Sequence, residues 1–286
     1  MLKSENIKIE ISRSQWSENV DIKEYVEIKK ELLKREVSQL SKKPVFVIVQ
    51  ANDDPASDSY IRGKIKDAAQ IGVVAKLLKL PSEIGEQEIL KVIDDLNKDK
   101  EVDGFIVQLP LPKQIDEEKV KLAINPKKDV DGFHPLSVLP PCTPKGILGY
   151  LKALGERIEG KNALVIGRSN IVGKPMAKLL LKENANVVVL HSKTSFENMK
   201  KYVSIADIIV IAIGKKHFLD QRFAYNKNAI IIDVGINKDE TGLHGDALPD
   251  LPVRLQTPVP GGVGLLTRLA LLENLLEVIK NGISNQ

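Results

Sequence analysis

Near its middle the chain carries Ala163-Leu164-Val165-Ile166-Gly167-Arg168-Ser169-Asn170-Ile171-Val172-Gly173, an apolar run followed by a turn with a glycine at each end. The apolar run suits a buried strand, and Lys174-Pro175 suits the first turn of a helix. A strand, a tight turn and a helix start can together hold a pyrophosphate, because backbone N–H groups at a helix N-terminus point at the ligand. Serine replaces the second glycine of the usual Gly-x-Gly-x-x-Gly and the last glycine falls one residue later, so the motif alone is a weak indication.

Alternating strand-like and helix-like segments extend from this stretch in both directions. We expect strands at residues 45–49, 73–78, 103–108, 162–166, 186–190, 208–213 and 229–234. We expect helices at about 22–41, from 55 toward Gly72, at 86–97, at 144–154 with Thr143 as the cap, from 174 onward, and at 265–280. This alternation predicts an α/β fold with mostly parallel sheets, and the proline-rich stretch 135–141 is typical of a linker between two domains.

Composition sets limits on the class of protein. A length of 286 residues allows two domains, and 43% hydrophobic with 28% charged residues is typical of a globular chain with a sizeable core. No apolar run reaches membrane-spanning length and Met1 to Asn6 lacks the apolar stretch of a secretion signal, so we expect a cytoplasmic protein. The charge of +4 comes from 42 basic and 38 acidic residues spread along the chain, without the basic arm typical of nucleic-acid binding.

A tyrosine and a lysine are placed four residues apart on one predicted helix. Asp54 can cap this helix and Pro55 suits its first turn, so Tyr60 and Lys64 share one helix face. Taken alone, such a pair is typical of an ordinary lysine packed along a half-buried ring.

Three other segments suggest a ligand site instead. Gln108 follows a buried strand that Pro110 ends, and ligands bind at the carboxyl ends of strands in open α/β sheets. The segment 127–135 holds paired acids before a glycine but lacks the alternating oxygen ligands of a calcium loop. The segment 257–264 is too rich in proline and glycine to be a plain strand.

Together these segments resemble the bifunctional methylenetetrahydrofolate dehydrogenase/cyclohydrolase family along nearly the whole chain. The residues that carry the resemblance are Asp54 to Ser57, Tyr60, Lys64, Val107 to Pro112, Asp129 to Pro135, Pro141 to Gly146, Gly167 to Pro175 and Thr257 to Gly264. Leu265-Leu266 depart from it, since a proline and a methionine are usual there.

The resemblance implies two α/β domains with a folate cleft between them. It implies that the last helix returns to the N-terminal domain, so that residues 1–136 and 265–286 form a folate-binding catalytic domain. Residues 137–264 then form an NADP-binding Rossmann-like domain, and the resemblance suggests a homodimer made through these cofactor domains.

The implied activities are oxidation of 5,10-methylenetetrahydrofolate to the methenyl compound and hydrolysis of that compound to 10-formyltetrahydrofolate. Hydride transfer needs positioning above all, whereas hydrolysis needs proton transfer, and Lys64 in a shielded cleft is the strongest candidate for it. We expect Gln108 to hold the Lys64 amine, Tyr60 to line the folate site and Asp131 to bind the aminopyrimidine edge, which gives the catalytic set Lys64, Tyr60, Gln108 and Asp131.

The resemblance also implies which residues bind the folate substrate and which bind the cofactor. The expected substrate-binding residues are Tyr60, Lys64, Val107, Gln108, Leu109, Asp131, Pro260, Gly261, Gly262, Val263 and Gly264. The expected cofactor-binding residues are Gly167, Arg168, Ser169, Ile171, Gly173, Ser192 and Ile236. No acid stands in His191-Ser192-Lys193-Thr194, where an NAD-specific fold often has one, and Arg168 can pair with a 2′-phosphate, so NADP is favoured over NAD.

Several alternatives remain open at this point. Ser192 and Lys193 can be solvated loop residues, and an enzyme of this fold can be a dehydrogenase only, linked to NAD. A non-catalytic NADP sensor is a more distant alternative. Cys142 is the only cysteine and the four histidines lie on separate predicted turns, so we expect no disulfide and no metal requirement.

Overall fold

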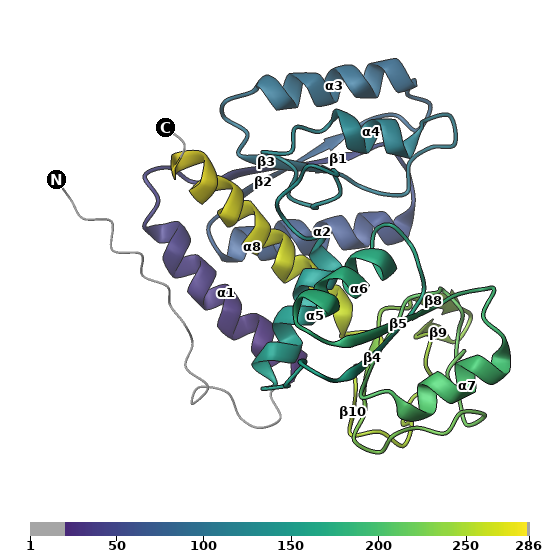
Figure 1. Ribbon diagram of the computed structural model, residues 1–286. Coiled ribbons are helices and arrows are strands. Elements are labelled where there is room, and N and C mark those ends of the chain that lie inside the picture. Colours follow the sequence, from purple (N-terminus) through teal and green to yellow (C-terminus); the bar gives the residue numbers. More distant parts are fainter. Residues whose placement is uncertain (1–20, 285–286) are drawn as a thin grey trace.

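The structure is a computed structural model that describes residues 21–284, and the expectation about Met1 to Asn6 lies outside them. Figure 1 shows two α/β units, each built on a parallel sheet, with the long C-terminal helix lying beside the first. The predicted α/β class with two units is confirmed. None of the described helices has the length and apolarity needed to span a bilayer.

The N-terminal unit has a three-stranded parallel sheet in the order β2-β1-β3. Its elements are α1 (Ile22–Ser38), β1 (Val45–Gln50), α2 (Pro55–Gln70), β2 (Val74–Lys79), α3 (Glu86–Lys98), β3 (Gly104–Val107) and α4 (Glu117–Ala123). Alternate residues of β1 face opposite sides of the sheet, so Val47 and Val49 pack with α3 and α4 while Phe46 and Ile48 pack with α1 and α2.

The second unit has a five-stranded parallel sheet in the order β10-β7-β6-β4-β5, and a separate β8–β9 hairpin. Its elements are α5 (Cys142–Ala153), β4 (Asn162–Ile166), α6 (Gly173–Lys182), β5 (Asn186–Leu190), α7 (Phe196–Ile205), β6 (Ile208–Ile211), β7 (Ile230–Asp233), β8 (Asn237–Asp239), β9 (Gly242–His244) and β10 (Leu255–Gln256). One face of the sheet packs on α5 and α6 and the other on α7.

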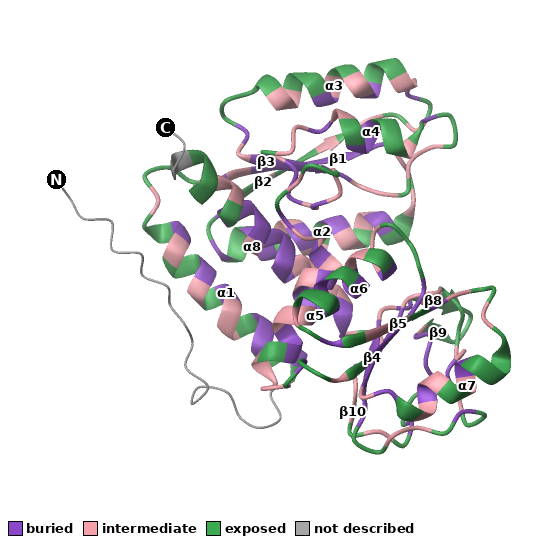
Figure 2. Cartoon of the chain, viewed as in Figure 1, coloured by how far each residue is buried: buried purple, intermediate pink, exposed green. Residues whose placement is uncertain are grey.

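The C-terminal helix α8 (Val263–Ser284) packs against α5, α1 and α2. Figure 2 shows its middle turns as buried, and Leu269, Leu272 and Leu276 are part of the core that contains α1 and α2. The helix crosses α5 at Gly146, where a Cβ would overlap the backbone carbonyl of Leu266, so only glycine fits this close approach.

Most predicted elements are confirmed, with ends that differ by a few residues. The prediction that Thr143 caps a helix starting at Pro144 is wrong, because α5 already begins at Cys142 and has no side-chain cap. The Thr143 hydroxyl instead lies 2.9 Å from that of Thr267 on α8. The hairpin and β10 were not predicted, since strands of two or three residues carry too little periodicity.

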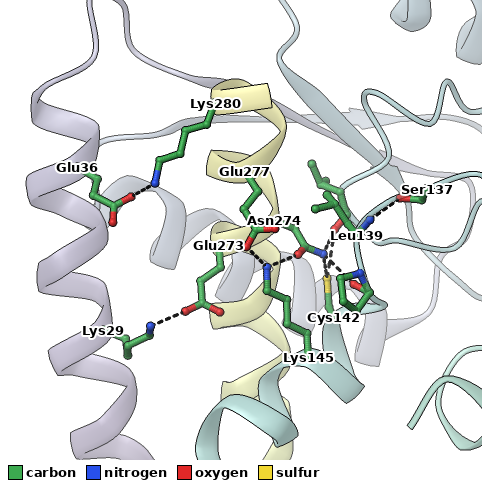
Figure 3. A network of polar contacts seen from close by, with 12 residues as sticks. Lys29, Glu36, Ser137, Leu139, Cys142, Lys145, Glu273, Asn274, Glu277 and Lys280 are labelled. Carbon is green, nitrogen blue, oxygen red and sulfur yellow. Dashed lines mark hydrogen bonds and ion pairs between the residues drawn. The ribbon is translucent and has the colours of Figure 1, made fainter. Parts of the chain in front are cut away.

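One buried amide ties α8 to the loop before α5 (Figure 3). Asn274 is fully buried, and its Nδ2 donates to the carbonyl oxygens of Val130 at 2.9 Å and Pro140 at 3.1 Å. Its Oδ1 accepts a hydrogen bond of 2.7 Å from Lys145 Nζ. A single side chain therefore fixes the segment before the linker, at Val130, and the end of the linker, at Pro140, to the C-terminal helix.

We expect Asn274→Leu to lower the free energy of unfolding by about 2–4 kcal/mol, because it removes the amide donor from two buried carbonyl groups, of which Val130 keeps only the weak Cys142 thiol donor at 3.3 Å. Urea denaturation measures the change. The matched control is Lys280→Ala, which removes an exposed ion pair with Glu36 on the same helix and should cost less than about 1 kcal/mol. Equal effects of the two substitutions would contradict the anchoring role of Asn274.

Candidate active site

Lys64 is presented by α2. The helix begins as expected, with the Asp54 carboxylate accepting hydrogen bonds from the N–H groups of Ala56 at 3.2 Å and Ser57 at 3.0 Å. Lys64 is only 6% exposed, and its Nζ lies 5.0 Å from the centroid of the Tyr60 ring. The aromatic face and the amine are thus neighbours, within the range of a cation–π contact.

Gln108 follows β3 and meets the lysine from the sheet edge. Its Oε1 accepts a hydrogen bond of 3.0 Å from Lys64 Nζ, and its Nε2 donates to the carbonyl of Leu109 at 2.7 Å. The second bond fixes the orientation of the amide, so the oxygen and not the nitrogen faces the amine. Val107, just before it, is buried in the sheet and supports the strand end.

The loop that carries Asp131 is fixed by a neighbouring carboxylate. Asp129 is 1% exposed and accepts hydrogen bonds from the N–H groups of Gly132 at 3.0 Å and His134 at 2.8 Å. Gly132 has a φ of +72°, a conformation that favours glycine. These contacts explain the Asp-Val-Asp-Gly pattern: the first acid holds the loop and the second faces the site.

The two charged catalytic candidates, Lys64 and Asp131, perturb each other electrostatically. Burial raises the pKa of Asp131 to about 6, and the nearby Lys64 amine partly opposes this. Burial also lowers the pKa of Lys64, while Asp131 and Cys142 act in the opposite direction and Arg268 adds to the lowering. An amine whose pKa moves toward neutrality can take up and release a proton under working conditions.

The start of α8 completes this side of the site. Burial raises the pKa of Tyr60, and the neighbouring Thr267 side chain on α8 partly opposes this. Thr267 also contacts Thr143 on α5, so Tyr60 is linked to both helices. The loop before α8 forms, with Ile236, a cavity of about 80 Å³, lined by Pro258 to Gly264, Asp233 to Ile236 and Leu243.

A second cavity of about 250 Å³ lies at the carboxyl ends of β4 and β5. Three of the expected cofactor residues, Gly167, Arg168 and Ser192, line it. His191 and Lys215 also line it, and neither was predicted. Arg168 and Ser192 are exposed, so their donors can reach a ligand. A lysine after a strand end is a weak sequence signal, which explains why Lys215 was missed.

The predicted phosphate turn lies beside this cavity. Ser169 Oγ accepts hydrogen bonds from the N–H groups of Val172 at 3.2 Å and Gly173 at 3.3 Å, so the serine stabilises the turn. Gly173 packs so closely on the carbonyl of Gly167 that a Cβ would overlap it. Ile171 is half-buried in the same turn. Ser169, Ile171 and Gly173 therefore shape the turn and do not line the larger cavity.

Two buried acids that were not predicted hold the loops around the cofactor cavities. Asp246 is fully buried and accepts hydrogen bonds from the N–H groups of Ile213 at 2.7 Å, Gly214 at 3.0 Å and Lys215 at 2.7 Å. Asp233 accepts from the N–H groups of Gly235 at 2.9 Å and Ala247 at 2.8 Å. No local sequence motif marks either acid, and only the folded loops show which N–H groups each one binds.

Within residues 21–284 no group of three or more histidine, cysteine, aspartate or glutamate side chains is placed to hold a metal ion. The absence of a metal requirement stays a prediction. The free thiol of Cys142 is buried, and its Sγ lies 4.0 Å from Asp131 Oδ1.

The fold and site define a class: a two-unit α/β enzyme with a nucleotide cavity on one sheet and a buried lysine on the other. Comparison with known proteins gives the family. The model described as tetrahydrofolate dehydrogenase/cyclohydrolase, catalytic domain, matches residues 20–131, and the model for the NAD(P)-binding domain matches residues 141–283. The chain belongs to the tetrahydrofolate dehydrogenase/cyclohydrolase family.

Individual relatives agree with this assignment. The bifunctional protein FolD of Enterococcus faecalis is 45% identical over 267 residues, which are 89% of this chain and 93% of that protein. The bifunctional enzyme FolD of Campylobacter jejuni has a solved structure with a TM-score of 0.86 at 37% identity, covering 90% of this chain and 96% of that one. The predicted family and its two activities, a dehydrogenase and a cyclohydrolase of one-carbon folate metabolism, are confirmed.

A further solved structure shows a relative with its cofactor. The methylenetetrahydrofolate dehydrogenase-cyclohydrolase of Trypanosoma brucei, complexed with NADP and an inhibitor, has a TM-score of 0.87 at 30% identity, covering 92% of this chain and 97% of that one. The second unit of this chain is accordingly a nicotinamide-dinucleotide domain, as predicted.

We expect Asp131→Asn to stabilise the ligand-free protein above pH 6. A folded-state pKa of about 6 against an ordinary 3.8 means that folding favours the protonated carboxyl, so this stabilisation is complete below pH 4 and lost as the pH rises through 6. The variant should gain about 1–2 kcal/mol over wild type at pH 8 and nothing at pH 3.5. Urea denaturation across this range measures the difference.

The control is Asp53→Asn, an exposed acid whose pKa is lowered by its hydrogen bond with Lys79. Its effect on stability should have the opposite sign. An Asp131→Asn variant that is less stable than wild type at pH 8 would contradict the burial argument.

Proposed function

We propose that Lys64 is the proton-transfer group of the cyclohydrolase reaction, with Gln108, Tyr60 and Asp131 as its partners. The observation that carries this proposal is the buried Lys64 amine, hydrogen-bonded to Gln108 and facing an acid. The substrate binds between this group and the loop from Pro260 to Gly264, with Val107 and Leu109 at the strand end beside it.

The dehydrogenase step depends on positioning. When bound, NADP accepts the hydride that leaves the methylene carbon of the folate. The chain contributes a fixed distance between the two ligands, because Pro260 to Gly262 lead directly into α8 at Val263, and α8 also carries Thr267 beside Tyr60. The same element therefore borders the Ile236 cavity and the folate side.

The hydrolysis step needs a base and then an acid. The neutral Lys64 amine accepts a proton from the water that attacks the methenyl carbon, and the resulting ammonium returns it to the ring nitrogen as the carbon–nitrogen bond breaks. The remaining hydroxyl proton is released to solvent as the formyl carbonyl forms. Gln108 Oε1 accepts a hydrogen bond from either form of the amine, so it holds Nζ in place throughout. Asp131 stabilises the ammonium form by its charge and binds donors on the pterin.

Residues around the larger cavity suit NADP better than NAD. Arg168 and Lys215 line it, and Ser192 offers a hydroxyl donor where an acid would repel a 2′-phosphate. Gly167, with a φ of +128°, lets the backbone turn tightly at the end of β4, so the ligand can approach the main chain closely. These residues fit the cofactor's phosphates, and Ile236 borders its nicotinamide end.

Assembly and location are proposed on separate grounds. Strand β5 is an edge of its sheet, and Val189 on it and Leu181 on α6 are exposed, which suits a homodimer formed through the cofactor units. Light scattering of the purified protein tests this.

The reduced Cys142 suits the cytoplasm, which cell fractionation tests. We retain residues 1–136 with 265–286, and 137–264, as the proposed domains. Limited proteolysis tests the first boundary and should cut near the exposed Leu136.

We expect Lys64→Met to lower cyclohydrolase kcat at least about 100-fold, because a side chain of similar length loses its proton-transfer group. Dehydrogenase activity should fall far less, so methenyl product should accumulate during turnover. Absorbance of the methenyl compound and of NADPH follows both reactions at once.

The control is Lys66→Met, an exposed lysine on the same helix. It should leave both activities unchanged. Hydrolysis of the methenyl compound by Lys64→Met at the wild-type rate would remove Lys64 from the mechanism.

We expect Arg168→Gln to raise KM for NADP by about 10–100-fold while KM for NAD changes little, because the lost contact is a charge-assisted bond to the 2′-phosphate. Initial rates with each cofactor give the ratio. Lys182→Gln removes the same charge at the far end of α6 and should not change it. Equal increases for both cofactors would show that Arg168 does not read the 2′-phosphate.

A further inference from the structure

Arg268 joins a buried ion cluster beside the site. The cluster consists of Lys30 on α1, Asp67 on α2 and Arg268 on α8. Lys30 Nζ lies 2.7 Å from Asp67 Oδ1, and Arg268 Nε lies 2.8 Å from Asp67 Oδ2 as an ion-pair contact. The side chains of Lys30 and Asp67 are 5% and 6% exposed, and that of Arg268 is 20% exposed, so water screens these charges only weakly.

A missing side chain makes room for the guanidinium. A Cβ on Gly63 would overlap Arg268 Nη1 and would also touch Cζ. The guanidinium therefore lies directly against the backbone of α2, at the residue before Lys64. This placement requires glycine at position 63, in the middle of a helix where glycine costs about 1 kcal/mol relative to alanine.

Lys30 is shared between two acids, so it does not neutralise Asp67 alone. Its Nζ pairs with Asp67 and also with Glu27 Oε1 at 3.1 Å, and it donates a hydrogen bond of 3.2 Å to Gln70 Oε1. Arg268 is the second cation of the cluster, and its guanidinium reaches past Asp67 to the backbone of α2 at Gly63, the residue before Lys64.

The groups that face the Lys64 amine come from several elements. They are Tyr60 on α2, Gln108 after β3, Asp131 in the loop, Cys142 on α5 and Arg268 on α8. Of these, Asp131 and Cys142 favour the ammonium, and Arg268 opposes it. Arg268 is the one cation in this set, so it offsets the acid across the site.

We propose that Arg268, seated on Gly63 and held by Asp67, is a positioning residue for the hydrolysis reaction whose fixed charge favours the neutral form of the Lys64 amine. The inference rests on the proposed role of Lys64 in proton transfer. Its consequence is that the base form of Lys64 is available at a lower pH than Asp131 alone would allow.

The test is the pH dependence of kcat/KM for hydrolysis of the methenyl compound, measured with the full-length chain. Wild type should show a rising limb set by Lys64. Arg268→Gln should move this limb to higher pH by about 0.5–1 unit, which is a 3- to 10-fold loss below it, and reach the wild-type plateau above it. Arg268→Lys keeps the charge, so its rising limb should lie close to the wild-type position. Dehydrogenase kcat/KM should change less than 2-fold in both variants.

A second variant keeps the charge but displaces it. Gly63→Ala places a methyl group where Nη1 now lies and also favours the helix, so loss of folding is not expected. The rising limb should move in the same direction as in Arg268→Gln. Lys29→Gln is the matched control, because it removes a cation from the α1–α8 contact with Glu273 without touching Gly63.

Two results would overturn the inference. A limb that stays in place in both Arg268→Gln and Gly63→Ala, with only a lower plateau, would mean that Arg268 acts through packing alone. Unchanged hydrolysis and an unchanged limb in Lys64→Met would remove the role of Lys64 itself, and the inference with it. The two failures are distinct, because the first leaves Lys64→Met inactive.

Discussion

A lysine amine shielded from water is costly to charge unless its partners compensate for lost hydration, and the architecture around Lys64 supplies such partners from several elements. Gln108 provides an oxygen at 3.0 Å, Tyr60 provides an aromatic face, and Asp131 provides an opposite charge. Gln108 directly follows β3, Tyr60 lies in the second turn of α2, and Asp131 lies in the loop between α4 and α5. Moving any of these elements would leave the amine either unpaired or solvated.

Helix α8 holds those elements together although it lies at the far end of the chain. Its apolar residues fill the core between α1, α2 and α5, and Asn274 bonds the carbonyl groups of Val130 and Pro140 on either side of the Asp131 loop. Its first turn carries Thr267, which reaches Tyr60, and Arg268, which reaches Asp67. The loop before it forms the Ile236 cavity. One helix therefore couples the position of the cofactor side to that of the buried lysine.

How far the sequence predicts this structure depends on the range of each interaction. Local signals located α2, because Asp54 and Pro55 act within one turn, and apolar runs located β4 and β5 with their ends. Contacts between distant segments were beyond such signals. Thr143 has the right side chain for a cap, yet it pairs with Thr267, 124 positions along the chain. Asp246 showed no motif because its partners are three backbone N–H groups and the Asn237 side-chain amide, which only the folded loops bring together.

The same distinction separates the residues that identify the family from those that adjust this chain. The family motifs contain the residues that meet at the site, which are Tyr60, Lys64, Gln108 and Asp131. No motif marks Asp67 or Arg268, which lie within helices α2 and α8. Gly63 gives the clearest example: within a helix it is a destabilising choice, and its reason appears only when the Arg268 guanidinium is seen against it. Glycine at position 63 lowers the stability of α2, but it allows the Arg268 guanidinium to lie next to Lys64. The balance of Asp131 and Arg268 across that amine then determines how readily it carries a proton, which is the property that hydrolysis requires.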